Sequence, residues 1–212
     1  MFGVQRHDEG FSLGGWWQEP FTFDDANGDG IITPDELTIA DTTEFLGHSR
    51  PQHEVSFFNS FTISKRVRLS GLFDYRGGHK QYNLTELFRC RFNICSGIND
   101  PSASLEEQAR AQTQKASTRT DAGFIEDAWF IKLRELSLTF FAPESWARAL
   151  RADRVNLTIT GRNLFTITDY TGLDPEVQGQ DDVGGANGGF LGRDFLTQPP
   201  VRSFSARLNV TF

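Results

Sequence analysis

Oxygen-bearing residues recur at a fixed spacing in the twelve residues from Asp25 to Glu36. Calcium is a hard cation that takes six to eight oxygen ligands, and a twelve-residue loop of this pattern wraps them around one ion. A glycine at the sixth position, here Gly30, permits the sharp turn that the loop needs. The predicted ligands are Asp25, Asn27, Asp29, the backbone carbonyl of Ile31, and a bidentate Glu36. The sequence therefore predicts a candidate Ca²⁺ site.

The residues around this loop leave a second interpretation open. No amphipathic helix precedes Asp25, so the loop is not part of a helix–loop–helix sensor. The same residue types are also typical of a loop that is ordered by its own Asx turns, without a metal. The last four residues, Thr33-Pro34-Asp35-Glu36, have the pattern of a capping box and predict a short helix over Glu36–Ala40.

The other residues that could do chemistry do not form a catalytic set. The four histidines, at positions 7, 48, 53 and 79, share no ligand spacing. The sequence has no nucleophile elbow, P-loop or dinucleotide fingerprint. We therefore expect no enzymatic activity. The formal net charge of −7 argues against a nucleic-acid partner, which would favour a basic surface.

Two cysteines, Cys90 and Cys95, lie close together within a polar stretch. In an oxidising compartment they could form a local disulfide. They could equally be two unpaired thiols in a loop. A metal site is the least favoured interpretation, because no second pair of Cys or His residues follows at a suitable spacing.

The elements that would position these residues show a period of two. Apolar residues at Val67, Leu69, Gly71, Phe73 and Tyr75 alternate with polar ones, with Leu72 the exception, which predicts a strand with one apolar face. Similar alternation covers Val55–Phe61, Ala128–Phe141, Val155–Gly161 and Arg202–Phe212. In the run over Ala128–Phe141 the phase slips by one residue at Arg134-Glu135, which predicts a β-bulge. No run of eighteen apolar residues predicts a transmembrane helix.

The connections between these five runs alternate between short and long. They are residues 62–65, 77–127, 142–153 and 163–200. This alternation is typical of a transmembrane β-barrel, whereas a compact β-sandwich rarely carries two such long loops. If Phe212 lies at the periplasmic end, both long loops are extracellular and both short turns are periplasmic. We expect most of the long loops, including Gln178–Gly189, to be solvated, and Ala142–Leu150 to contain a short helical turn.

Several stretches resemble one known family. Gly123–Phe140 and Gly161–Glu176 are similar to late barrel strands of TonB-dependent transporters of the SusC/RagA type. The ending Pro199–Phe212 resembles the last strand of that family, and Asp25–Glu36 resembles a recurrent aspartate-rich segment in it. The resemblance spans nearly all of residues 1–212, in the same order along the chain.

The resemblance implies an all-β fold, a partial antiparallel transmembrane β-barrel made of the C-terminal strands of a barrel of about 22 strands. The N-terminal plug and the TonB-contacting segment of the family have no counterpart in residues 1–212, and the N-terminus lacks the apolar core of a signal peptide, so we expect the chain to begin further upstream. Arg202–Phe212 would be the closing strand, with Phe204, Leu208 and Phe212 toward lipid. The implied location is the outer membrane of a Gram-negative, Bacteroidetes-like cell.

The same resemblance implies the function and the partners. Members of the family import glycans or peptides together with a SusD-like surface lipoprotein, using energy delivered by the TonB complex. The terminal Phe212 resembles the signal that the barrel assembly machinery reads. The alternative is a soluble extracellular calcium-binding β-domain, for adhesion or carbohydrate binding, which would rest on the Asp25–Glu36 loop and the alternating strands.

Overall fold

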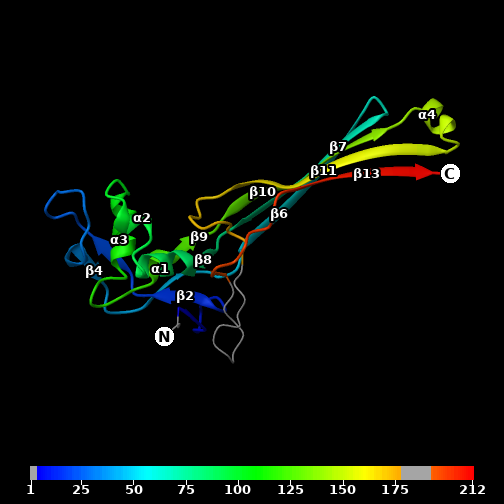
Figure 1. Ribbon diagram of the computed structural model, residues 1–212. Coiled ribbons are helices and arrows are strands. Elements are labelled where there is room, and N and C mark those ends of the chain that lie inside the picture. Colours follow the sequence, from blue (N-terminus) through cyan, green and yellow to red (C-terminus); the bar gives the residue numbers. More distant parts are fainter. Residues whose placement is uncertain (1–3, 178–191) are drawn as a thin grey trace. The chain divides into compact units, whose positions relative to one another are not determined.

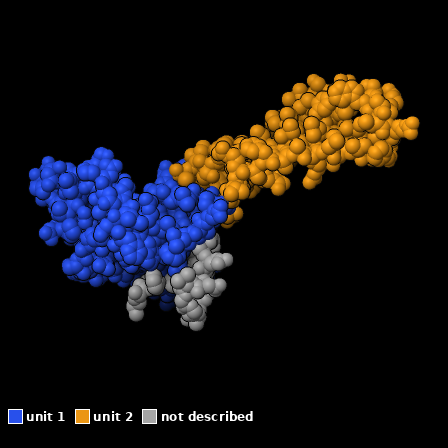
Figure 2. Space-filling view, in the orientation of Figure 1, with its two compact units in different colours: residues 1–52, 78–129, 169–199 blue, residues 53–77, 130–168, 200–212 orange. Residues whose placement is uncertain are grey.

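The computed structural model describes residues 4–177 and 192–212. The chain divides into two compact units, which have different colours in Figure 2. Unit 1 comprises residues 1–52, 78–129 and 169–199, and unit 2 comprises residues 53–77, 130–168 and 200–212. Each unit is thus built from three separate segments of the chain. The stretch Gln178–Gly189, which we expected to be solvated, lies outside the described residues.

Unit 2 is an antiparallel sheet of five strands in the order β13–β11–β10–β7–β6 (Figure 1). Its strands are β6 (His53–Ile63), β7 (Val67–Gly77), β10 (Phe130–Phe141), β11 (Arg154–Ile167) and β13 (Ser203–Thr211). The strands lie beside one another in chain order, so the sheet is a meander. All five predicted strands are confirmed, because alternation over seven or more residues is a strong signal for a strand.

Rows of paired residues give the sheet one apolar face, since directly paired residues project to the same side. One row contains Ile63, Val67, Phe140, Leu157 and Leu208. The next row on this face contains Phe61, Leu69, Leu138, Ile159 and Ala206. Many of these side chains are exposed, among them Phe61 at 59% and Leu208 at 64%. The apolar face is therefore uncovered by other described residues of the chain.

The opposite face of the sheet is mainly polar and internally hydrogen-bonded, although the paired Phe58 and Leu72 also lie on it. The hydroxyl oxygens of Thr139 and Thr158 lie 2.9 Å apart across β10 and β11. Arg162 Nε donates to Glu135 Oε2 at 3.0 Å. The predicted β-bulge is also confirmed, because the register of β10 shifts between Leu133 and Glu135 against both of its neighbours. The bulge keeps the apolar residues on one face along the whole strand.

Short connections join the strands at one end of the sheet. Ser64 and Lys65 have φ values of 53° and 57°, and the Arg66 N–H donates to the Ile63 carbonyl at 3.2 Å. A turn with positive φ at both central residues matches the twist of a hairpin. The second short connection contains helix α4 (Glu144–Ala149), as expected for Ala142–Leu150. At the other end of the sheet, the chain continues from the strands into the segments of unit 1.

Unit 1 is made of short strands and helices. One sheet has the order β1 (Gln5–Arg6), β2 (Gly15–Gln18), β5 (Glu44–Gly47), and a hairpin pairs β3 (Phe21–Phe23) with β4 (Leu37–Ile39). A third sheet has the order β12 (Arg193–Asp194), β8 (Lys80–Asn83), β9 (Ile125–Asp127). The α-helices are α1 (Leu84–Arg91), α2 (Ser96–Asn99) and α3 (Leu105–Gln112); the 3-10 helices are η1 (Pro34–Glu36) and η2 (Ala122–Phe124).

A hydrophobic core holds unit 1 together. Trp16, Leu87 and Phe124 are fully buried, and Tyr82 is 2% exposed. The Trp16 indole N–H donates to the Lys80 carbonyl at 2.9 Å, which satisfies the polar atom of this buried ring. The expectation that the long loops are largely solvated is therefore wrong for residues 78–129. The apolar residues of this segment do not follow a regular strand or helix spacing along the sequence. In the folded chain they nevertheless pack into one hydrophobic core.

The predicted helix over Glu36–Ala40 is also wrong. A capping-box contact forms between Thr33 and Glu36, but the helical turn η1 ends at Glu36. The next residues form β4, in which Leu37 pairs with Phe23 and Ile39 with Phe21. Pairing with β3 overrides the helix-start signal, and the β-branched Thr38 and Ile39 favour a strand.

The fold is mainly β, with helices α1 to α3 as a contribution that the all-β prediction did not include. The described strands do not close into a barrel, because β6 and β13 stand at the two ends of an open sheet. Within residues 4–177 and 192–212, no helix is long and apolar enough to cross a membrane.

Candidate functional site

The first three predicted calcium ligands lie together in unit 1. The Asp25 carboxylate accepts hydrogen bonds from the backbone N–H groups of Gly28, Asp29 and Gly30 at 2.9, 3.2 and 3.0 Å. Asn27 Oδ1 accepts from the Asp29 N–H at 2.8 Å. These bonds curl the backbone around the side-chain oxygens, as both the metal-loop and the Asx-turn interpretations require.

Glu36, at the last position of the loop, does not converge with the first three ligands. Asp29 Oδ1 accepts from the Ile31 N–H at 2.8 Å. Glu36 Oε2 instead accepts from the N–H and the hydroxyl of Thr33, at 2.9 and 3.0 Å. Among the residues that the structure describes, Asp25, Asp29 and Glu36 do not form a group whose carboxylate oxygens all lie within 4.8 Å of one another. The structure therefore brings Asp25, Asn27 and Asp29 together and holds Glu36 in the capping-box contact.

Gln108 of α3 fastens this loop to the rest of unit 1. The Ile32 N–H donates to Gln108 Oε1 at 3.0 Å, and Gln108 Nε2 donates to the Gly30 carbonyl at 3.1 Å and the Ala103 carbonyl at 2.9 Å. Gln108 is 3% exposed and Ile32 is fully buried. The amide group of Gln108 thus both accepts from and donates to the backbone of the loop. These bonds hold the loop in place at Ile32, its eighth residue. Sequence reasoning missed this contact because 76 residues separate the partners.

The two cysteines form a disulfide between Cys90, in α1, and Cys95, which precedes α2. Of the interpretations that the sequence left open, the local disulfide is the one that the structure contains. Glu86 lies near both sulfurs, but sulfurs joined to each other do not bind metal as thiolates. The disulfide therefore has a structural role. It closes a short loop in which the side chains of Phe92 and Ile94 are exposed.

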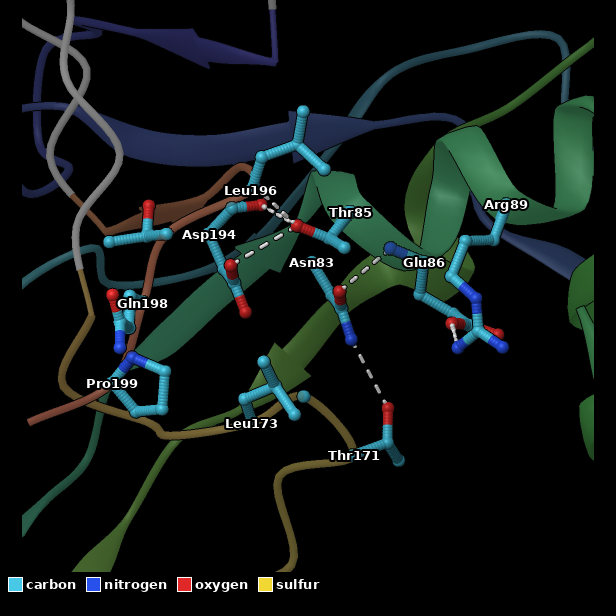
Figure 3. Close-up of a pocket in the computed structure, with 12 residues that line it drawn as sticks. Asn83, Thr85, Glu86, Arg89, Thr171, Leu173, Asp194, Leu196, Gln198 and Pro199 are labelled. Atoms are coloured by element: carbon cyan, nitrogen blue, oxygen red, sulfur yellow. Dashed lines mark hydrogen bonds and ion pairs between the residues drawn. The ribbon is translucent and has the colours of Figure 1, made fainter. Parts of the chain in front are cut away.

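A cavity of about 410 Å³ lies beside the start of α1 (Figure 3). Its lining residues come from β8 and α1, from residues 171–173, and from residues 194–199. Asp194 is 3% exposed and lines it. Tyr170 donates to Asp194 Oδ2 at 3.1 Å and Thr85 donates to Oδ1 at 3.2 Å, so each carboxylate oxygen has a hydroxyl donor. The cavity is of the size that binds small molecules or single side chains.

Burial governs the ionisation of this carboxyl. Burial raises the pKa of Asp194 above its usual range, against the opposing effect of the hydrogen bonds from Tyr170 and Thr85. The negative charges of Glu126 and Asp174 act in the same direction as burial. Burial also raises the pKa of the Tyr170 phenol, so this hydroxyl keeps its proton and remains a donor. Sequence reasoning did not single out Asp194, since nothing in its local spacing marks it.

An ion pair in the neighbouring part of unit 1 is already complete. Arg110 Nη1 and Glu126 Oε1 are 3.0 Å apart, with both side chains less than 15% exposed. Glu126 also accepts hydrogen bonds from Asn83 Nδ2 at 3.1 Å and from the Thr171 N–H at 3.0 Å. These residues tie β8, β9, α3 and residue 171 together. Arg110 and Glu126 also line a second cavity of about 630 Å³.

Comparison with known proteins gives related sequences and similar structures. No family model matches the chain. Two relatives from Formosa agariphila, TonB-dependent receptor P3 and TonB-dependent receptor P26, are 27% and 26% identical to it, each over 90% of the chain. The RagAB peptide importer in its closed-closed state covers all of the chain with a TM-score of 0.66 at 16% identity. The RagAB peptide transporter covers 94% of the chain with a TM-score of 0.63, also at 16% identity.

The chain is thus related in sequence to TonB-dependent receptors, and its fold is similar to that of RagAB. It spans about a fifth of the length of the two receptors from Formosa agariphila and about a quarter of the RagAB chain. The structural likeness to RagAB covers the whole chain and therefore extends over both units. The resemblance noted from Gly123–Phe140 and Gly161–Glu176 is confirmed.

Proposed function

We propose that this receptor chain forms part of the wall and of the extracellular surface of an outer-membrane transporter, which imports glycans or peptides with a SusD-like surface lipoprotein and energy from the TonB complex. The observation that carries the proposal is the five-stranded meander with one apolar and one polar face, in a chain related to TonB-dependent receptors. One structural neighbour of the chain, RagAB, is described as a peptide importer.

The two faces of unit 2 fit the two environments of a barrel wall. Exposed apolar side chains such as Phe57 at 56%, Ile159 at 50% and Leu208 at 64% would be costly in water but are stable against lipid. The hydrogen-bonded Thr139–Thr158 face would line the lumen. The free edges of β6 and β13 would pair with further strands, to give a barrel of about 22 strands.

The C-terminal strand supports the proposed direction of the chain. β13 and Phe212 correspond to the predicted closing strand Arg202–Phe212, and the Phe212 side chain is 82% exposed. We propose that Phe212 is read by the barrel assembly machinery at the periplasmic side. The hairpin at Ser64-Lys65 and the α4 connection would then be periplasmic, and unit 1 would be extracellular, where substrate and lipoprotein arrive.

A pair of adjacent substitutions in β11 tests the barrel. In the receptor that carries this chain, Leu157→Arg would place a charge against lipid, where the cost is about 2–4 kcal/mol at the middle of the bilayer and smaller toward its edge, near which Leu157 lies as the fourth residue of β11. Thr158→Arg, the matched control, would face the lumen and leave the amount of receptor in the outer membrane near the wild-type level. Equal outer-membrane levels of the two variants would contradict the assignment of faces. Recovery of the wild-type protein with soluble proteins would instead favour the alternative of a soluble calcium-binding β-domain.

Uptake tests the transport step. Cells that express the receptor should accumulate labelled oligopeptides or oligosaccharides in a way that requires TonB and the lipoprotein. Loss of the receptor gene should abolish this accumulation. Equal accumulation with and without TonB would refute active transport.

We also propose that the Asp25–Glu36 loop binds Ca²⁺. The donor set is chemically suited, since Asp25, Asn27 and Asp29 present oxygen atoms from a backbone that is already curled, and Gln108 anchors the loop. Glu36 would complete the set by leaving Thr33. Titration of the purified receptor with Ca²⁺ should raise its midpoint of thermal unfolding, and Asp25→Asn should remove the shift. Asp35→Asn, an exposed acidic residue of the same loop at a non-ligand position, should retain it.

A further inference from the structure

The cavity beside α1 contains an acidic group that lacks a cationic partner. Asp194 is hydrogen-bonded by two neutral hydroxyls, and no ion pair within residues 4–177 and 192–212 involves it. An ionised carboxylate can accept about four hydrogen bonds, so these two donors leave acceptor capacity on both oxygens. Because a buried charge is costly unless it is paired, a cation that entered the cavity would gain a strong interaction.

The walls of the cavity would suit a long aliphatic chain that ends in a charge. Leu173 and Leu196 are 77% and 76% exposed, and together with Pro199 they form an apolar part of the lining. Figure 3 shows Asp194 between Leu196, above it in the view, and Leu173, below it. Lysine and arginine bury their methylene stems on apolar surfaces in this manner while the charged end reaches a polar partner.

The arginine in the cavity lining does not oppose such a ligand. Arg89 Nη1 lies 2.7 Å from Glu86 Oε2, so its charge is compensated on α1 itself. Figure 3 shows this pair at the far side of the view from Gln198 and Pro199. The remaining polar lining residues are neutral: Asn83, Thr85, Thr171, Thr197 and Gln198. The cavity as a whole therefore carries the net negative charge of Asp194.

The charge of unit 1 favours the same class of ligand. Its three segments contain 23 acidic and 9 basic residues, a formal charge of −14, whereas the segments of unit 2 contain 5 acidic and 12 basic residues. A strongly acidic surface attracts cationic solutes and raises their local concentration. Steering by the surface and pairing in the cavity would thus act together.

We propose that the Asp194 cavity binds the lysine or arginine side chain of a peptide. The ammonium or guanidinium group pairs with the Asp194 carboxylate, and the methylene stem lies against Leu173 and Leu196. This inference rests on the proposed import function and narrows its substrate to peptides with a basic residue. Because Asp194 is held from both sides by hydroxyls, it offers a fixed rather than a mobile anion to the ligand.

Binding of matched peptides to the purified full-length receptor tests the inference. The probes are Ala-Ala-Lys-Ala and the same peptide with norleucine in place of lysine, which keeps the stem and removes the charge. We expect the lysine peptide to bind about 10-fold to 100-fold more tightly, the range for a hydrogen bond to a charged group. Asp194→Asn should bring its affinity down to that of the norleucine peptide. Asp41→Asn removes one exposed acidic residue of unit 1 elsewhere and should leave the difference intact.

A second variant tests the inference without changing the buried Asp194, whose replacement could disturb folding. Leu196→Lys adds a cation at an exposed site in the lining and should weaken binding of the lysine peptide more than that of the norleucine peptide. Equal affinity of the wild-type receptor for the two peptides overturns the inference but leaves peptide import standing. Binding of oligosaccharides and of neither peptide overturns both the inference and the assignment of peptides as substrates.

Discussion

Gln108→Met would test how the Asp25–Glu36 loop is held. Methionine keeps the side-chain volume and removes all three hydrogen bonds of the amide. The Ile32 N–H then stays buried without an acceptor, at a cost of about 1–3 kcal/mol, whereas the carbonyl of the exposed Gly30 can turn toward water. The half-buried Ala103 carbonyl adds a smaller loss. We expect the loop to be destabilised locally by about 2–3 kcal/mol, a 30-fold to 150-fold shift toward its open state at about 1.4 kcal/mol per tenfold.

Hydrogen exchange followed by mass spectrometry measures this shift directly. In the receptor that carries this chain, the backbone amide of Ile32 should exchange about 30-fold to 150-fold faster in Gln108→Met than in the wild type. Gln112→Met is the matched control, because Gln112 lies one turn further along α3 and makes no side-chain hydrogen bond to the part of the chain that the structure describes. Unchanged exchange at Ile32 in Gln108→Met, or equal acceleration in both variants, would refute the reasoning.

Three further perturbations follow from unit 1. Replacing Cys90 and Cys95 together with serine should destabilise the unit by about 2 kcal/mol, because the closed ring is short, and the variant should show no further loss of its melting midpoint when reductant is added. Phe124→Ala should cost about 3–5 kcal/mol and lower the yield of folded receptor, whereas Phe92→Ala, at a side chain that is 66% exposed, should leave the yield unchanged. Asp194 has a raised pKa in the folded state, so its contribution to stability is complete below the unfolded pKa and declines as the pH rises through the folded pKa. Asp194→Asn should therefore become more stable relative to the wild type as the pH rises above the unfolded pKa of about 4, and a constant difference in melting midpoint would contradict this.

The sheet of unit 2 could be predicted from the sequence because its signal is local and long. The alternation from Val67 to Tyr75 decides both the strand and its faces, and a single slip near Arg134 is enough to place the bulge. The short turn at Ser64-Lys65 then fixes the pairing of two strands. Each of these inferences needs only residues that are neighbours along the chain.

The strands of unit 1 were not predicted, because they contain only two to four residues, which is too few for a period of two to be recognised. A signal for α1 was nevertheless present, since Asn83 followed by Glu86 has the spacing of a helix N-terminus, and the Asn83 side chain accepts from the Glu86 N–H at 3.0 Å. The candidate site divides in the same way. The cluster around Asp25 can be predicted from the local spacing of its residues. The burial and the raised pKa of Asp194, by contrast, depend on segments that are distant in the sequence.

The interleaving of the two units sets an order in which the protein can fold. Trp16 bonds to a carbonyl 64 residues away, and Arg193 of β12 lies parallel to Tyr82 of β8 across an even longer stretch. Contacts of such separation form slowly, because long loops must close before burial offsets the entropy that they lose. The first two segments of unit 1 already contain the buried core cluster, whereas the sheet of β8 is complete only when residues 169–199 join them. Until β12 pairs with it, the backbone of β8 has an unpaired edge, which proteases and chaperones can recognise in an incompletely folded chain.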